Sequence, residues 1–184
     1  EPSRRQRQMC IRDRRRTEIV PVDSDFSMED MIAEEEVVLT ITHQGYIKRT
    51  ALNTYRTQRR GGRGVQGAMS KDEDFVEHLF IANTHNYMLF FTDMGKCYWL
   101  KVYDIPQGGR AARGRAIVNL IGCDPGERVE AFVSVKDFDD DHYIVMCTKN
   151  GIVKKTVLSA YGNPRKGGIY AIDIRDNDKL IEQE

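Results

Sequence analysis

The sequence predicts an all-β protein made of repeated, blade-like sheets arranged as in a propeller. Three apolar runs, each ending in threonine, precede turn glycines at Gly45, Gly95 and Gly151. A second short strand-like run follows each glycine, so each glycine is expected to close a hairpin. The three glycines lie 50 and 56 residues apart, a spacing typical of a structural repeat.

Each hairpin is predicted from two short apolar runs, one on either side of its glycine. Residues 37–42 and 46–50 form the first, 87–92 and 96–100 the second, and 143–148 and 152–156 the third. Short apolar runs bounded by turns predict buried strands, and Asn150-Gly151 is the strongest hairpin turn among the three.

A basic, glycine-rich loop and a further strand follow each hairpin. The loops end at Gly64, Gly114 and Gly168, at nearly constant distances from the hairpin glycines. The next strand is expected at 75–82 in the first copy and 129–135 in the second. By the same offset, Lys179-Leu180 begins it in the third copy.

Four-stranded units of about 50 residues are typical of blades arranged radially. We therefore expect one β domain over residues 36–184, with blade repeats near 36–85, 86–141 and 142–184. Because blade architectures usually hold about 4 to 8 units, three blades predict a fragment of a longer domain.

The segment before the β domain has a different character. Residues 17–35 are interpreted as a linker, and residues 1–16, rich in arginine, as a disordered or foreign tail. A basic DNA-binding arm is the alternative interpretation of the tail.

Charge is distributed in blocks although the formal net charge is zero, from 28 basic and 28 acidic residues. Residues 37–70 hold six basic and no acidic residues, and residues 149–170 hold five basic and no acidic ones. Such blocks allow a neutral chain to present a basic edge to nucleic acid. No apolar run approaches the roughly 20 residues of a membrane helix, so we expect a cytoplasmic protein without a membrane partner.

Signals for catalysis, metal binding or a cofactor are weak in this chain. The four cysteines are widely spaced without a CxxC pair, and the four histidines are scattered. The glycine-rich loop at 61–64 lacks the lysine and hydroxyl of a nucleotide-binding P-loop, and the aspartates at 137–141 lack calcium-loop spacing. We expect no catalytic residue, no metal and no cofactor here.

The segment from Gln58 to Gly64 reads Gln-Arg-Arg-Gly-Gly-Arg-Gly and is called the box below. It resembles the signature box of the C-terminal domain of the bacterial DNA gyrase A subunit. The lead-in at 15–19, the entry at 36–42 and the segment 45–49 resemble that family as well. The resemblance runs from about Arg15 to the end of the chain.

The resemblance implies a β-pinwheel of six blades, about the first three of which lie here, with double-stranded DNA bent around a basic rim. It also implies a role in ATP-dependent negative supercoiling, a type II topoisomerase reaction, inside an A2B2 assembly of gyrase A and gyrase B proteins. ATP and Mg²⁺ would be bound through the gyrase B partner. The breakage-reunion domain with its catalytic tyrosine is not part of this sequence.

Basic side chains at matching offsets in the three repeats are the candidate DNA-binding residues, because cations directed at phosphates hold a duplex without reading its sequence. Together with the box glycines and Gln58, which would shape the loop, they are Gln58, Arg59, Arg60, Gly61, Gly62, Arg63, Gly64, Lys48, Arg49, Arg110, Arg113, Arg115, Lys154, Lys155, Arg165 and Lys166.

Two alternative functions remain open from the sequence. One is the related C-terminal domain of the topoisomerase IV A subunit, in which the box is degraded or missing. The other is a non-enzymatic propeller that binds an acidic protein through its basic loops. The intact box favours gyrase over the first, and salt-dependent duplex binding would separate DNA binding from the second.

Overall fold

The computed structural model describes residues 28–55, 57–64, 74–175 and 177–183. The chain divides into two compact units, Glu1–Met31 and Ile32–Glu184. In the first unit, the described part is the short 3-10 helix η1 (Met28–Met31). The interpretation of residues 1–16 as a tail lies outside the described residues. The second unit holds every described strand.

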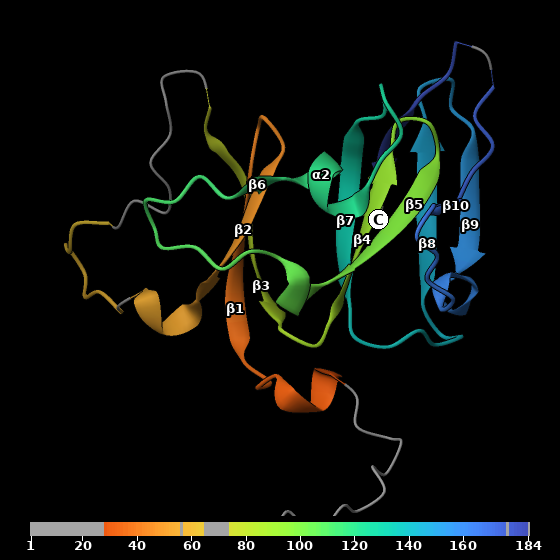
Figure 1. Ribbon diagram of the computed structural model, residues 1–184. Helices are drawn as coiled ribbons and strands as arrows, with labels where there is room; N and C mark the ends of the chain where they lie inside the picture. Colours follow the sequence, from red (N-terminus) through yellow and green to blue (C-terminus); the bar gives the residue numbers. More distant parts are fainter. Residues whose placement is uncertain (1–27, 56, 65–73, 176, 184) are drawn as a thin grey trace, which may run out of the picture. The chain divides into compact units, whose positions relative to one another are not determined.

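The first sheet is built around the hairpin of β1 (Glu36–Thr42) and β2 (Tyr46–Ala51). The two strands are antiparallel, with Leu39 opposite Arg49. β3 (Val76–Asn83) pairs with the other side of β1, again antiparallel (Figure 1). The predicted order of hairpin, loop and further strand is therefore confirmed in the first repeat.

The second and third repeats follow the same plan. β4 (Tyr87–Thr92) and β5 (Lys96–Lys101) form a hairpin, and β7 (Val129–Val135) pairs with β4. In the third repeat, β8 (Tyr143–Thr148) and β9 (Val153–Val157) form the hairpin, and β11 (Leu180–Gln183) pairs with β8. The strand expected to begin near Lys179-Leu180 is thus present.

Each hairpin turn is closed by the threonine at the end of its first strand. The hairpin-glycine N–H donates to the carbonyl of Thr42, Thr92 or Thr148 at 2.8 to 2.9 Å. The same threonine hydroxyls accept the backbone N–H four residues on, at 3.2 to 3.3 Å. All three hairpin glycines have φ between 76° and 81°, a left-handed conformation that favours glycine. This turn chemistry explains why each apolar run ends in threonine.

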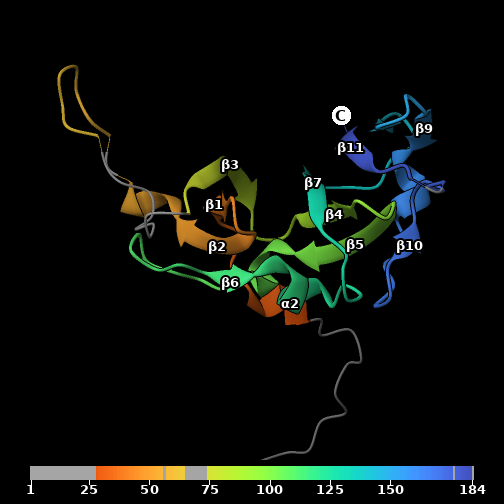
Figure 2. The same ribbon diagram turned by 90° about the horizontal axis from the view of Figure 1, so that it is seen from above.

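The fourth strand of a sheet comes from the following repeat. β6 (Arg115–Ala116) pairs with β2 of the first repeat, and β10 (Ile169–Tyr170) pairs with β5 of the second (Figure 2). The first two sheets therefore have four strands, and the third has three within the described residues. The sequence predicted four-stranded units of about 50 residues but not this exchange, which links consecutive repeats through backbone hydrogen bonds.

Short helical turns connect the strands. η2 (Leu52–Thr54), η3 (Val102–Asp104) and η4 (Leu158–Tyr161) follow the three hairpins at equivalent positions. One short α-helix, α2 (Ile117–Ile121), follows β6 and ends at Gly122, whose φ of 65° is left-handed. A left-handed glycine directly after the last turn is a common helix stop.

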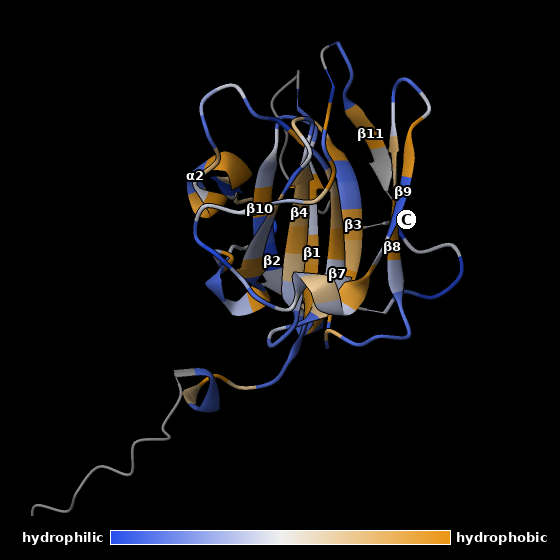
Figure 3. Cartoon of the chain, turned by 90° about the vertical axis from the view of Figure 1, so that its right-hand side faces the viewer, coloured by the Kyte–Doolittle hydropathy of each residue, from blue (hydrophilic) through white to orange (hydrophobic). Residues whose placement is uncertain are grey.

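The core lies between successive sheets, and β4 is therefore buried on both of its faces. Met88 and Phe90 pack with the first repeat, while Leu89 and Phe91 pack with the third, as strand alternation requires. Each such side chain contributes about 1.5 to 3 kcal/mol by its removal from water. Figure 3 shows hydrophobic positions, in orange, along β1, β4 and β7. In the part of the chain that the structure describes, no helix is long and apolar enough to cross a membrane.

Candidate nucleic-acid interface

The box forms a shaped turn. The N–H of Gly62 donates to the carbonyl of Arg59 at 2.9 Å, and Gly61 has a φ of 78°. A positive φ at the third residue of a four-residue turn is the type II arrangement, which calls for glycine there. A Cβ at Gly62 would lie 2.8 Å from Oε1 of Gln58. At Gly64, by contrast, a Cβ would meet nothing within 4 Å.

The arginines of the box project from this turn. The side chains of Arg59, Arg60 and Arg63 are all exposed. Guanidinium groups stay charged at any physiological pH and present several N–H donors to phosphate oxygens. A short glycine turn carrying three exposed arginines can therefore approach a phosphate backbone closely.

The loop of the second repeat has a turn at the same offset. The N–H of Ala112 donates to the carbonyl of Gly109 at 3.0 Å. Gly114 then takes a φ of 89°, and a Cβ there would lie 2.4 Å from the carbonyl oxygen of Ile47. Only glycine lets the loop press against β2 at this point, which brings Arg115 into register with Ile47.

Lys48 is a correction to the predicted DNA-binding set. Its side chain is 1% exposed, and Nζ donates to the carbonyl oxygens of Gly109, Arg110 and Ala112 at 3.1, 2.7 and 2.9 Å. Burial lowers the pKa of this ammonium. An ammonium with three donors already directed at carbonyls is not available to a phosphate. Lys48 instead holds the loop of the second repeat on the first sheet.

Arg49 also links two repeats. Its Nε donates to the carbonyl of Ile105 at 2.7 Å, and its backbone N–H donates to Pro106 at 3.1 Å. In the second repeat Trp99 takes the equivalent place, with Nε1 donating to the carbonyl of Tyr161 at 2.8 Å. The half-buried Arg49 therefore has a structural contact that the sequence pattern did not reveal.

Arg113 is held against the first hairpin. One terminal nitrogen donates to Oε1 of Gln44 at 2.6 Å, and the guanidinium lies 3.9 Å from the centre of the Tyr46 ring. Nε is 3.9 Å from a carboxylate oxygen of Asp74. The side chain remains 45% exposed, so one face is stacked and the other faces solvent.

The remaining predicted cations are at the surface. Lys154 donates from Nζ to the carbonyl of Ala171 at 2.6 Å, and Nζ of Lys155 lies 3.9 Å from the centre of the Tyr143 ring. Both lysines have exposed side chains. Other exposed members are Arg110, Arg115, Arg165 and Lys166.

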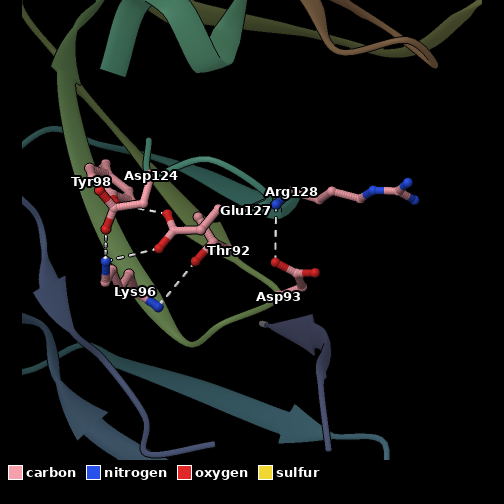
Figure 4. A network of polar contacts seen from close by, with 7 residues as sticks. All are labelled: Thr92, Asp93, Lys96, Tyr98, Asp124, Glu127 and Arg128. Atoms are coloured by element: carbon pink, nitrogen blue, oxygen red, sulfur yellow. Dashed lines mark hydrogen bonds and ion pairs between the residues drawn. The ribbon is translucent and has the colours of Figure 1, made fainter. Parts of the chain in front are cut away.

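One basic residue near these loops is neutralised by acids. Lys96, at the start of β5, pairs with Asp124 and, at 2.9 Å, with Glu127 (Figure 4). The hydroxyl of Tyr98 donates to the same Glu127 at 2.8 Å. The hydrogen bonds that Lys96 donates to the two carboxylates raise its pKa. Burial, followed by the bond to Glu127, raises the pKa of Tyr98 to about 12. This network ties β5 to the segment before β7.

The acidic turn at 137–141 is organised by local contacts. The backbone N–H of His142 donates to Oδ1 of Asp139 at 2.9 Å, and Nδ1 of His142 lies 2.8 Å from the same carboxylate. The backbone hydrogen bond, followed by the side-chain contact, lowers the pKa of Asp139. Among the described residues, no group of three or more histidines, cysteines and carboxylates is arranged to hold a metal ion.

Comparison with known proteins decides the family. Three successive segments, 36–83, 86–136 and 142–182, match the model of the DNA gyrase C-terminal domain, a beta-propeller. The chain belongs to this family. The all-β, propeller-like fold and the resemblance found in the sequence are both confirmed.

Individual relatives of this gyrase C-terminal domain agree. The DNA gyrase A subunit of Clostridium acetobutylicum is 52% identical over 169 residues, which are 92% of this chain and 20% of that protein. The chain thus spans about a fifth of the length of that curated relative. A solved C-terminal domain of DNA topoisomerase IV aligns with a TM-score of 0.70 at 31% identity, over 84% of this chain and 46% of the other. A solved DNA gyrase A C-terminal domain aligns with a TM-score of 0.61 at 26% identity, over 81% and 47%.

Residues that position the basic loops of this gyrase domain were missed by the sequence reasoning. Gln44, Tyr46 and Asp74 hold Arg113, and the carbonyl of Ile105 holds Arg49. Tyr46 could have been predicted as a contact residue, because it directly follows the hairpin glycine Gly45 in a repeat that also carries a basic loop. The backbone carbonyl acceptors could not have been predicted, because every residue has a carbonyl whatever its side chain.

Proposed function

We propose that this domain binds and wraps duplex DNA without sequence specificity, as the C-terminal part of a DNA gyrase A subunit. The observation that carries the proposal is the intact box, a shaped glycine turn with three exposed arginines. Each phosphate neutralised by such a cation releases condensed counterions, which favours binding and makes it strongly salt-dependent.

Wrapping requires more than one loop. Smooth bending of 20 to 30 base pairs through a large angle costs about 1 to 6 kcal/mol, so contacts must be spread along the path. Exposed cations at Arg110, Arg115, Arg165 and Lys166 supply further contacts in the second and third repeats. Lys48 is omitted from this surface because its ammonium is buried.

In the complete enzyme, the wrapped duplex would present a second DNA segment to the cleavage gate with a fixed handedness. That geometry would bias strand passage toward negative supercoils. The gyrase A protein would form a dimer joined by two copies of the gyrase B protein, which would bring ATP and Mg²⁺. This domain contributes handedness and contains none of the proposed cleavage chemistry.

Topoisomerase IV is the second candidate, because its solved C-terminal domain aligns well with this chain. The likeness concerns the architecture that both enzymes share. The box supports gyrase, as do the names of the relatives at about half identity over most of this chain.

The test replaces Arg59, Arg60 and Arg63 by alanine in a full-length gyrase A protein that carries this sequence. Together with the gyrase B protein, the variant should lose ATP-dependent negative supercoiling while it still relaxes supercoiled DNA, because cleavage lies elsewhere. Unchanged supercoiling would refute the proposal. Replacement of the exposed Lys136, outside the basic loops, by alanine is the matched control.

A further inference from the structure

Residues 32–35, called the strap below, lie directly before β1 and are bonded to the turn between β3 and β4 (Figure 1). The N–H of Thr84 donates to the carbonyl of Glu35 at 2.9 Å, which carries the pairing of β1 with β3 one residue further. The Thr84 hydroxyl accepts the N–H of Glu35 at 3.0 Å and donates to the carbonyl of Ala33 at 2.9 Å. This one side chain, only 2% exposed, therefore holds two strap residues.

The neighbours of Thr84 hold the other two strap residues. Nδ2 of Asn83 donates to Oε1 of Glu34 at 3.0 Å, and Nε2 of His85 lies 2.9 Å from the carbonyl oxygen of Ile32. A histidine that carries a proton on Nε2 donates to such a carbonyl, whether the ring is neutral or charged. Each strap residue is thus in hydrogen-bond contact with one of three consecutive residues of the turn.

The turn that receives the strap is itself fixed to the second repeat. The N–H of Tyr103 donates to the carbonyl of Thr84 at 3.0 Å, and Nζ of Lys101 donates to the carbonyl of His85 at 3.0 Å. The rings of His85 and Tyr103 lie edge to face, with their centroids 6.5 Å apart. The strap is therefore fastened at the point where the first and second repeats are joined.

A segment that is bonded at four successive residues fixes the direction in which the chain enters the β domain. An unbonded segment loses its direction within a few residues, because each backbone unit has several accessible conformations. The strap is the last part of the segment 17–35, which the sequence led us to interpret as a linker. Its hydrogen bonds remove that conformational freedom from the four residues next to the domain.

We propose that the strap sets the orientation of this domain relative to the upstream part of its polypeptide, and that Thr84 is the residue that positions the strap. In the proposed function, the wrapped duplex must reach the cleavage gate in one orientation, so the strap couples wrapping to strand passage. This coupling rests on the proposed function, whereas the fastening of the strap by Thr84 does not. In this role Thr84 acts through the strap and contacts neither DNA nor the gate.

Thr84→Val is the informative variant, because valine keeps the shape of threonine and removes the hydroxyl. Thr84→Ser keeps the hydroxyl and is the rescue variant. The matched control is Thr40→Val, because Thr40 of β1 is 1% exposed and its hydroxyl has no hydrogen-bond partner within the described residues. His85→Phe is a second, independent variant, which keeps a ring beside Tyr103 and removes the contact to Ile32.

The experiment uses the full-length gyrase A protein that carries this sequence, and four measurements. Amide hydrogen exchange in a peptide that contains residues 32–36 reports on the strap. The linking-number shift of nicked circles sealed by ligase in the presence of the protein reports on wrapping without strand passage. With the gyrase B protein, the rate of ATP-dependent negative supercoiling reports on the coupling, and relaxation without ATP reports on the gate.

We expect Thr84→Val to speed exchange in the strap by on the order of tenfold, because two hydrogen bonds that oppose local opening are lost. Supercoiling by this variant should be several-fold slower, while its linking-number shift and its relaxation stay at the wild-type level. His85→Phe should change exchange and supercoiling in the same direction. Thr84→Ser and Thr40→Val should match the wild type in all four measurements.

The strap is overturned if Thr84→Val and His85→Phe both keep wild-type exchange. Its orienting role is overturned if exchange rises while supercoiling stays at the wild-type rate, or if the linking-number shift falls together with supercoiling in both variants. A wild-type protein that gives no linking-number shift would refute the proposed function instead, and the exchange data would still decide whether Thr84 fastens the strap.

Discussion

The Nζ atom of Lys48 donates a 2.7 Å hydrogen bond to the carbonyl oxygen of Arg110, 62 residues further along the chain. The bond joins a buried cation of one repeat to the turn of the next, directly beneath an exposed arginine. One basic residue thus builds the loop from which another projects. Basic residues at equivalent sequence offsets therefore divide into structural and exposed groups.

Replacement of Lys48 by methionine should destabilise the fold without removing a DNA contact. Three carbonyls lose a charged donor, and a hydrogen bond to a charged group contributes about 1.5 to 3 kcal/mol. We expect a loss of that size in the free energy of unfolding, measured by urea denaturation. The exposed Lys136→Met is the control and should change stability by less than about 0.5 kcal/mol. Equal stability of the two variants would contradict the structural role of Lys48.

Gly114 and Gly64 offer a matched pair at the ends of two equivalent loops. Gly114→Ala forces a side chain into the left-handed region, at a cost of about 1 to 3 kcal/mol, and places Cβ 2.4 Å from the Ile47 carbonyl. The pairing of β6 with β2 should weaken, and the midpoint of thermal unfolding should fall.

In the present chain Gly64→Ala meets open space, so its thermal midpoint should stay near that of the unmodified protein. A similar drop for both variants would argue against the specific docking of the second loop.

Tyr98 predicts a dependence of stability on alkaline pH. Burial, and then the hydrogen bond to Glu127, raise its pKa from 10.0 to about 12, so the fold favours the neutral phenol. The corresponding stability is complete below pH 10 and is lost as the pH rises from about 10 to 12. Tyr98→Phe should lose about 1 to 3 kcal/mol at neutral pH, because a buried carboxylate loses a donor.

The same variant should show a shallower decline of stability between pH 10 and 12, measured by denaturation at fixed pH values. The Lys96 pair stays present in both proteins, so the difference between the curves isolates Tyr98. Parallel curves would mean that the phenol does not titrate with folding.

The local parts of the fold could be predicted from the sequence. Each hairpin is specified by neighbouring residues, such as Thr42 and Gly45, whose hydrogen bonds span three or four positions. β6 could not be predicted, because the two residues Arg115 and Ala116 carry no periodicity that marks a strand. β6 pairs with β2 because the chain of the second repeat folds back onto the first sheet, which is a feature of the tertiary structure.

The sequence predicted a set of basic residues, but it did not predict which of their side chains are buried and which are exposed. Lys48 and Lys154 stand at the same offset from a hairpin glycine, yet the first is buried and the second exposed. Burial depends on whether a neighbouring loop covers the strand, and that contact spans more than 60 residues. Sequence offsets therefore predicted a set of basic residues without separating those that hold the loops in place from those that are exposed.

The central claim is that exposed arginines on glycine turns wrap duplex DNA, and the linking number of sealed DNA circles tests it most directly. A nicked circular plasmid is incubated with the full-length gyrase A protein, closed by ligase, and freed of protein. The wild-type protein should shift the linking number in one consistent direction, and the Arg59→Ala, Arg60→Ala, Arg63→Ala triple variant should leave it near the protein-free value. A triple variant that shifts the linking number as far as the wild type would contradict the claim.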